Sequence, residues 1–123
     1  MKRLFLILLF VMINLFAFSQ EKQNSSINDA GVYKLYPTEN NWMFLKLNTR
    51  TGEIWHVQFT VENPQNRFQE LITSMLAFGS EQKNGRFELY PTNNFYNFIL
   101  LDTIDGRAWQ VQWGKEHQIL PIR

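Results

Sequence analysis

Apolar and polar residues alternate most clearly in two short stretches that lie far apart in the chain. In the first stretch, one side of the chain carries Trp55, Val57 and Phe59, and the other carries His56, Gln58 and Thr60. In the second stretch, one side carries Trp109, Val111 and Trp113, and the other carries Ala108, Gln110 and Gln112. A period of two with large rings on one side predicts a half-buried β-strand whose rings lie in the core. We therefore expect Trp55 and Trp109 to be core residues, each costing ~3–5 kcal/mol of stability when replaced by alanine.

These two stretches belong to an internal repeat. Residues 31–62 recur as residues 85–116 at a constant offset of 54 without a gap, and 14 of the 32 positions are identical. The identical positions include the whole Leu-Tyr-Pro-Thr block that begins at Leu35 and recurs at Leu89. Self-similarity at a fixed period indicates a tandem duplication of one structural unit.

Two further strands precede the alternating stretch in each repeat. The predicted ranges are 32–36 and 42–47 in the first repeat, and 86–90 and 96–101 in the second. The earlier strand of each pair ends at a proline, Pro37 or Pro91, because proline cannot donate to a β-ladder. The later strand is apolar on both faces, which is typical of the central strand of a meander. Each repeat is thus predicted to be a three-stranded antiparallel meander.

The hairpin between the second and third strands has a strong turn pattern. Residues 48–52 and 102–106 begin with Asn48 or Asp102 and end with glycine. An Asn or Asp side chain can bind the backbone of its own turn, and glycine adopts a positive φ at low cost. Both ranges therefore predict a hairpin loop of four or five residues.

The segment between the repeats fits two structures. Over residues 64–78 the apolar positions recur at helical spacing, with Pro64 in the first turn and Gly79 at the end. Alternatively, residues 67–72 correspond to residues 118–122 and form a short fourth strand in each repeat. A strand followed by a short helix would satisfy both patterns, so the sequence leaves the two open.

The predicted fold class is mostly β. A single sheet of three strands would leave its aromatic face in water, so two repeats are expected to pack on each other with approximate two-fold symmetry. The expected product is a small sandwich or a partly closed barrel, with one short helix between the repeats as an open alternative. Residues 31–123 are predicted to form a single domain.

The start of the chain has the pattern of a secretory signal peptide. Lys2 and Arg3 precede an almost wholly apolar run over residues 4–18, and Ala17 and Ser19 supply the small residues of a cleavage site. The apolar run is shorter than the roughly 20 residues of a membrane-spanning helix. We expect cleavage after residue 19, a flexible leader over residues 20–30, an exported product in the periplasm or medium, and no stable membrane insertion. An uncleaved anchor is the alternative.

The charge balance indicates which partners are not expected, and the cysteine content indicates how the domain is stabilised. Removal of residues 1–19 leaves 10 basic against 11 acidic residues. A near-neutral chain of this kind is not expected to bind nucleic acid or an anionic membrane, since both require clustered positive charge. The chain has no Cys, so an exported domain must be stabilised by its apolar core without disulfides.

The repeat resembles one found in small, uncharacterised exported bacterial proteins. The shared features are the Tyr-Pro-Thr corner, the Leu-Asp-Thr strand end and the Trp-Gln-Val-Gln-Trp strand, which in this chain are best seen at Tyr90, Asp102 and Trp109. The resemblance implies export and a β-rich fold, and it implies no activity.

A second similarity concerns the hairpin that begins at Asp102. The pattern Asp-Thr-x-x-Gly-x-x-Trp is similar to a corner of pyrroloquinoline-quinone-type propeller blades. A propeller needs about four to eight blades and this chain has two repeats. We therefore attribute the similarity to shared hairpin chemistry and predict no cofactor.

The candidate binding residues are aromatic rings and amides. Gln58 and Gln112 are identical across the repeats and are expected to lie opposite the core rings. One hypothesis is structural, namely amide pairing between symmetry-related strands. The other is a polar floor for a glycan or protein ligand, because rings cover apolar ligand faces and amides meet hydroxyls. The rings expected around such a floor are Tyr36, Tyr90, Trp42 and Tyr96.

Catalytic and metal-binding patterns are weak. His56 and His117 are the two histidines and neither recurs in the other repeat, so both are predicted to face solvent. Asp102 and Asp105 flank a turn, and the ligand count is too low to predict a metal site. The preferred hypothesis is a non-enzymatic exported binding module. The alternatives are a structural protein that self-associates edge to edge, and a small hydrolase that uses Asp102 or Glu53 with His56.

Overall fold

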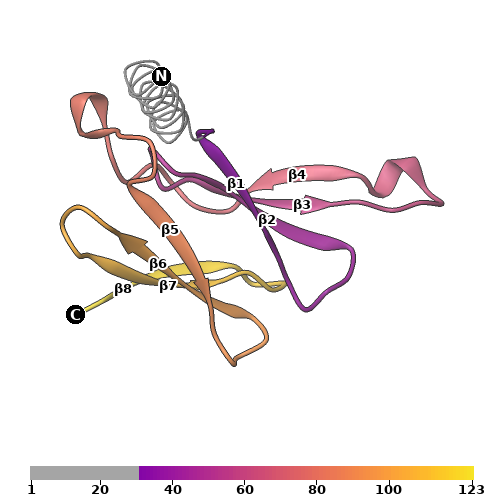
Figure 1. Cartoon of the computed structure of the whole chain (residues 1–123). Helices are drawn as coiled ribbons and strands as arrows, with labels where there is room; N and C mark the ends of the chain where they lie inside the picture. The colour runs from indigo at the N-terminus through magenta and orange to yellow at the C-terminus, as the bar shows by residue number, and fades with distance from the viewer. Residues whose placement is uncertain (1–30) are drawn as a thin grey trace, which may run out of the picture. The chain divides into compact units, whose positions relative to one another are not determined.

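The computed structural model describes residues 31–123. The predicted signal peptide (residues 1–19) and leader (residues 20–30) lie outside the described residues. Residues 31–123 form a mostly β sandwich of two four-stranded antiparallel sheets (Figure 1). Between residues 31 and 123, no helix has the length and apolar character that crossing a membrane requires.

Each repeat forms one sheet, and the strands follow sequence order in space. Sheet 1 comprises β1 (Tyr33–Pro37), β2 (Met43–Asn48), β3 (Ile54–Gln58) and β4 (Phe68–Leu71). Sheet 2 comprises β5 (Phe87–Pro91), β6 (Asn97–Asp102), β7 (Ala108–Gln112) and β8 (Gln118–Ile122). The predicted strands of both repeats are confirmed, with bounds that differ by one or two residues, and the tandem meander is confirmed as well.

Each repeat continues into a fourth strand, which is one of the alternatives that the sequence leaves open. Trp55 lies opposite Leu71, and Trp109 lies opposite Pro121, so the offset between the two fourth strands is 50 and not 54. The connection that leads into β4 is longer than the one that leads into β8, which hides the correspondence from an ungapped alignment. Of the two structures left open for residues 64–78, the strand is the one observed.

Helix in the segment between the repeats is limited to two 3-10 turns, η2 (Pro64–Asn66) and η3 (Gly79–Glu81). The apolar residues at helical spacing do not share one buried face, since Ile72 is buried while Phe68 and Leu71 are exposed. In the strand, the backbone of β4 is hydrogen-bonded to the edge of β3. A helix here would need an apolar surface to pack against in order to be more stable than this strand.

The hairpin turns have the predicted chemistry in both sheets. The Asn48 side chain accepts hydrogen bonds from the backbone N–H groups of residues 50 and 51, and Asp102 does the same for residues 104 and 105. Gly52 and Gly106 have φ of +82° and +79°, a conformation that side-chain-bearing residues rarely adopt. These local interactions explain why the pattern was readable from sequence.

The two sheets do not bury the same face of the repeat. Sheet 1 buries Leu45, Leu47, Ile54 and His56, whereas sheet 2 buries Leu89, Leu100, Trp109 and Val111. At the offset of 54, the buried residues of one sheet correspond to outward or half-buried residues of the other. Two-fold packing would bury the same face of both repeats. Here the face of sheet 1 that carries His56 packs against the face of sheet 2 that carries Trp109, an arrangement called face-to-back below, so the predicted two-fold packing is wrong.

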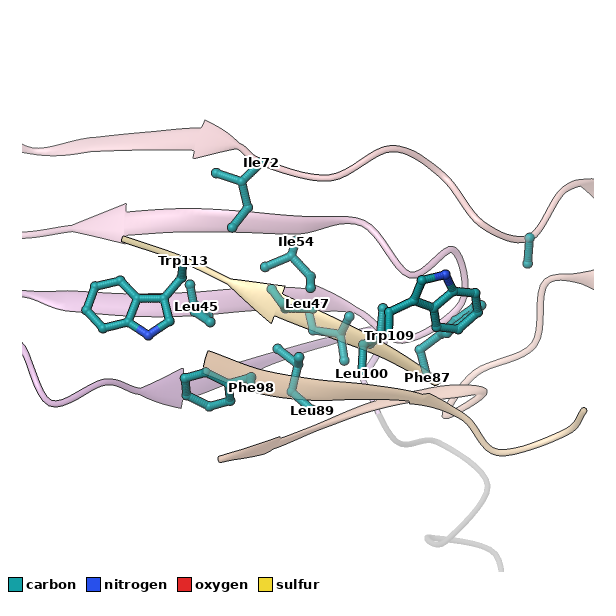
Figure 2. Packing of buried hydrophobic residues seen from close by; sticks show 12 residues of the cluster. Leu45, Leu47, Ile54, Ile72, Phe87, Leu89, Phe98, Leu100, Trp109 and Trp113 are labelled. Carbon is teal, nitrogen blue, oxygen red and sulfur yellow. The ribbon is translucent and has the colours of Figure 1, made fainter. Parts of the chain in front are cut away.

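Trp55 and Trp109 illustrate the difference directly. Trp109 is buried in the core shared by the two sheets (Figure 2). Trp55 is half-buried on the outer face of sheet 1, where its ring lies 4.6 Å from the Lys46 Nζ atom. The prediction that both rings are core residues is confirmed for Trp109 and wrong for Trp55.

Candidate functional site

A cleft of about 480 Å³ lies between the two sheets. One wall comes from sheet 1 and the loop before β2, and the other from the loops that precede β6 and β8. The lining residues are Asn40, Met43, His56, Glu70, Phe95, Tyr96, Trp113, Gly114, Lys115 and His117. Clefts of roughly 300–1,000 Å³ with rings and a few convergent polar groups are typical of small-ligand sites.

Three aromatic rings in edge-to-face and tilted contact form the wall on the side of sheet 2. The Phe95 and Tyr96 ring centroids lie 4.6 Å apart, and those of Tyr96 and Trp113 lie 5.5 Å apart. Trp113 donates its Nε1–H to the backbone carbonyl of Phe95 at 3.2 Å, which fixes the indole. A Cβ on Gly114 would lie 2.8 Å from the Tyr96 ring, so glycine is what allows the phenol to pack there.

The loop before β6 holds these rings by side-chain bonds to its own backbone. The Thr92 hydroxyl accepts from the Asn94 N–H at 3.1 Å, and the Asn94 side chain accepts from the Tyr96 N–H at 3.1 Å. Thr and Asn favour tight turns because their side chains replace distant backbone partners. The ring pair is thus presented on a short, internally bonded loop.

His56 is the central polar group of the opposite wall. It is buried on β3, and its Nε2 bonds the Trp113 carbonyl, so Nε2 must carry the proton. Its Nδ1 lies 3.9 Å from the Glu70 carboxylate, and its ring centroid is 5.9 Å from that of His117. Burial lowers the pKa of His56 below its usual 6.5, and the Trp113 bond and Glu70 oppose this only in part. The neutral ring presents Nδ1 as a hydrogen-bond acceptor.

The prediction that His56 faces solvent is wrong, whereas His117 is exposed as predicted. The error has a physical cause. The alternation predicts that the side with the rings is buried in both repeats, whereas in sheet 1 the opposite face, with Ile54 and His56, is the buried one. Two substitutions could have indicated this: Ile54 replaces Ala108, and Lys46 lies on the outer face where Leu100 lies in the core.

The sequence-predicted amides and rings lie in separate places. Trp42 and Gln58 line a pocket of about 270 Å³, and Tyr96 and Gln112 line another of about 300 Å³. Each ring thus meets the amide of its own repeat. Gln58 lies on the face of sheet 1 that is turned toward sheet 2, whereas Gln112 lies on the outer face of sheet 2, so a floor shared by both amides is excluded.

The two corner tyrosines are also apart from the cleft. Tyr36 lines a further pocket of about 270 Å³, together with Pro37 and Pro91, and its hydroxyl accepts a hydrogen bond from the Leu89 N–H at 3.5 Å. Tyr90 is exposed and donates its hydroxyl hydrogen to Glu88. Tyr96 is the one sequence-predicted binding residue that lines the large cleft.

The carboxylates considered for catalysis have structural partners. Asp102 is fully buried, with Arg86 bonding both of its oxygens at 2.8–3.1 Å and Arg107 approaching to 3.3 Å. Burial raises the pKa of Asp102, but Arg86 and two backbone N–H groups outweigh it and lower the value to about 2. Glu53 accepts a hydrogen bond from the Thr51 hydroxyl. The carboxylate that contacts His56 is Glu70.

Within residues 31–123, no three His, Asp or Glu side chains group so as to hold a metal ion. The cleft offers rings, the imidazoles of His56 and His117, the Glu70 carboxylate and the Lys115 ammonium group. Such a set can hold an uncharged or weakly charged polar molecule by stacking and hydrogen bonding.

No protein-family model matches the chain, and no curated protein or solved structure is significantly similar to it. The resemblance of its repeat to small exported bacterial proteins accordingly stays a prediction from sequence.

Proposed function

We propose that this protein is an exported, non-enzymatic binding module whose cleft between the sheets takes a glycan of the cell envelope or extracellular medium. The observation that carries the proposal is the convergence of the Phe95–Tyr96–Trp113 rings and the His56–Glu70 pair on one cleft of about 480 Å³. Export rests on the pattern of residues 1–19.

The two walls suit the two sides of a sugar ring. The apolar C–H face of a pyranose covers an aromatic ring, and Tyr96 is half-exposed at the cleft with its ring supported by Phe95 and Trp113. Hydroxyl groups on the other edge would donate to the His56 Nδ1 atom and the Glu70 carboxylate, and accept from Lys115. A protein ligand would use the same groups through its backbone and is the alternative occupant.

The test is a binding screen of the full chain, expressed with its own N-terminal segment, against envelope and extracellular oligosaccharides. Thermal unfolding reports binding, since a ligand at 100 times its dissociation constant adds about 2.7 kcal/mol to stability. We expect a saturable shift with one saccharide class and no cleavage products. Tyr96→Ala should abolish the shift, because it removes the exposed stacking surface.

Trp42→Ala is the matched control, since Trp42 occupies the corresponding position of the first repeat and is exposed outside the large cleft. It should leave the shift unchanged. If Trp42→Ala abolishes binding and Tyr96→Ala does not, the site is the Trp42–Gln58 pocket and the large cleft is rejected. If no saccharide binds and an envelope protein co-purifies in a manner that depends on Tyr96, the glycan part of the proposal is rejected.

A further inference from the structure

Because the two sheets bury opposite faces of the repeat, each sheet keeps one face that no other part of residues 31–123 covers. The first, called here the open face of sheet 1, carries Tyr33, Leu35, Lys46, Trp55 and Leu71, which share one side of the sheet by register. Tyr33 and Leu35 are 56% and 59% exposed. Their counterparts in the second repeat, Phe87 and Leu89, are 0% and 3% exposed because sheet 1 covers them.

The second is called here the open face of sheet 2 and carries Glu88, Tyr90, Gln110, Leu120 and Ile122. Ile122 is 51% exposed, whereas its counterpart Ile72 is 8% exposed in the core between the sheets. In the open face of sheet 1, Tyr33, Leu35 and Trp55 correspond to buried residues of sheet 2. In the open face of sheet 2, Gln110 and Ile122 correspond to the buried His56 and Ile72 of sheet 1. The molecule itself shows what covers such a face, namely a neighbouring repeat in the same orientation.

We propose that copies of this chain associate head to tail, with the open face of sheet 2 in one copy covering the open face of sheet 1 in the next. The contact would continue the stacking that already exists between the two sheets of one chain. It differs from edge-to-edge pairing, because the strands of neighbouring copies would share a core and not a ladder.

The chemistry of the two open faces supports the same pairing. The exposed apolar side chains of Leu35 and Ile122 lie at positions that are buried in the other repeat. Lys46 gives the open face of sheet 1 a positive charge. Glu88 gives the open face of sheet 2 a negative charge on its edge strand β5, where the carboxylate also lies 4.0 Å from the Lys34 ammonium group of the same chain. Lys46 lies over the Trp55 and Tyr33 rings and donates to Gln69, so its charge is held at the centre of its face. Two copies of the same open face would instead oppose like charges.

A head-to-tail contact either closes into a ring or grows without limit. Rings of radially stacked four-stranded sheets are the architecture of β-propellers, which close with about four to eight sheets. Since each chain supplies two sheets, the expected assembly is a closed ring of two, three or four copies. Such a ring covers both open faces.

The experiment measures the mass of the full chain in solution by light scattering over a range of concentrations. The wild-type protein should form one discrete oligomer, and Leu35→Glu and Ile122→Glu should each reduce it to smaller species. Both residues are exposed in the single chain, so neither change should unfold it, which circular dichroism checks. Ile104→Glu is the matched control, because Ile104 is 55% exposed in the turn after β6 and lies on neither open face; it should leave the oligomer intact.

Mixing the two variants tests the head-to-tail geometry. The Leu35→Glu chain keeps an intact open face of sheet 2, and the Ile122→Glu chain keeps an intact open face of sheet 1. Together the two variants should form a one-to-one dimer that neither closes into a ring nor adds further chains. A wild-type chain that stays monomeric at its highest soluble concentration overturns the proposal. So does an oligomer that only one of the two variants disrupts, since that result indicates contact between identical faces.

Discussion

Sheet 1 and sheet 2 are built from one repeat and differ in which side of it is buried. Trp55 and Trp109 are the same residue at the same register position, yet one packs against Lys46 outside and the other lies in the core. The difference follows from a few substitutions. Leu100 makes that side of sheet 2 apolar where sheet 1 has Lys46, and Ile54 makes the other side of sheet 1 apolar where sheet 2 has Ala108. Identity between repeats therefore does not imply an identical environment.

The hairpin turns of the two sheets share their backbone geometry and differ in the charge of the residue that begins the turn. Asn48 and Asp102 make the same bonds to the backbone of their turns. In sheet 2 the side chain is charged, and Arg86 neutralises it, whereas Val32 holds that position in sheet 1. A buried ion pair has been added to a turn that forms without one, so its contribution can be measured against the neutral copy.

The largest expected effect separates the two tryptophans. Trp109→Ala should lower the free energy of unfolding by ~3–5 kcal/mol, because it leaves a cavity in the core between the sheets. Trp55→Ala should cost well under half as much, since the ring is already partly in water. Urea denaturation at low protein concentration measures both.

Protein concentration provides the control for that pair. At low concentration, open faces are uncovered and the two changes should differ as stated. Equal losses there would contradict the face-to-back arrangement of the sheets. If copies stack as proposed, the cost of Trp55→Ala should rise with concentration, because a neighbouring chain then covers the ring.

The next effect concerns the charged turn. The pKa of Asp102 is about 2 in the folded protein and 3.8 in the reference state, so its carboxylate stabilises the fold above pH 3.8 and this contribution is lost as the pH falls from 3.8 to 2. Asp102→Asn should therefore cost about 2 kcal/mol at neutral pH. Denaturation curves from pH 7 to pH 2 should show a smaller acid loss in the variant. An acid loss of unchanged size would contradict the role assigned to Asp102.

The sequence predicts the features that depend on residues close to one another along the chain. Three strands per repeat, both hairpin turns and the glycines at positive φ were readable, because alternation, Asx bonds and proline stops are local. β4 and β8 were left open, since Phe68–Leu71 and Gln118–Ile122 share no aligned pattern and their connections differ in length. The choice of buried face and the cleft around His56 were missed, because both depend on contacts between residues of different sheets.

A smaller effect distinguishes the glycines of the two turns. Gly106→Ala should cost ~1–2 kcal/mol, since alanine disfavours the positive φ and otherwise meets open space. Gly52→Ala should cost about 1 kcal/mol more, because its Cβ would lie 3.0 Å from the Leu76 side chain. Thermal unfolding of the two variants measures the difference. Equal losses would indicate that Leu76 moves aside at no cost.

The smallest effect compares His56 with Gln110, its counterpart in sheet 2. Burial lowers the pKa of His56 below 6.5, so the unfolded chain takes up a proton before the folded one does. Stability should therefore be complete above pH 6.5 and decline as the pH falls through that value. His56→Gln installs the residue of sheet 2 and should remove this decline. Denaturation between pH 7.5 and pH 5.5 measures it, in a range where the Asp102 carboxylate stays ionised.

His117→Gln is the control for that experiment. His117 faces the His56 ring at 5.9 Å from the exposed side of the cleft, whereas Glu70 is the carboxylate in contact with it. The His117→Gln protein should keep the decline between pH 7.5 and pH 5.5, because the buried imidazole remains. If His117→Gln removes the decline and His56→Gln does not, the titrating group is the exposed ring. In that case His56 would not be the neutral acceptor on which the binding proposal depends.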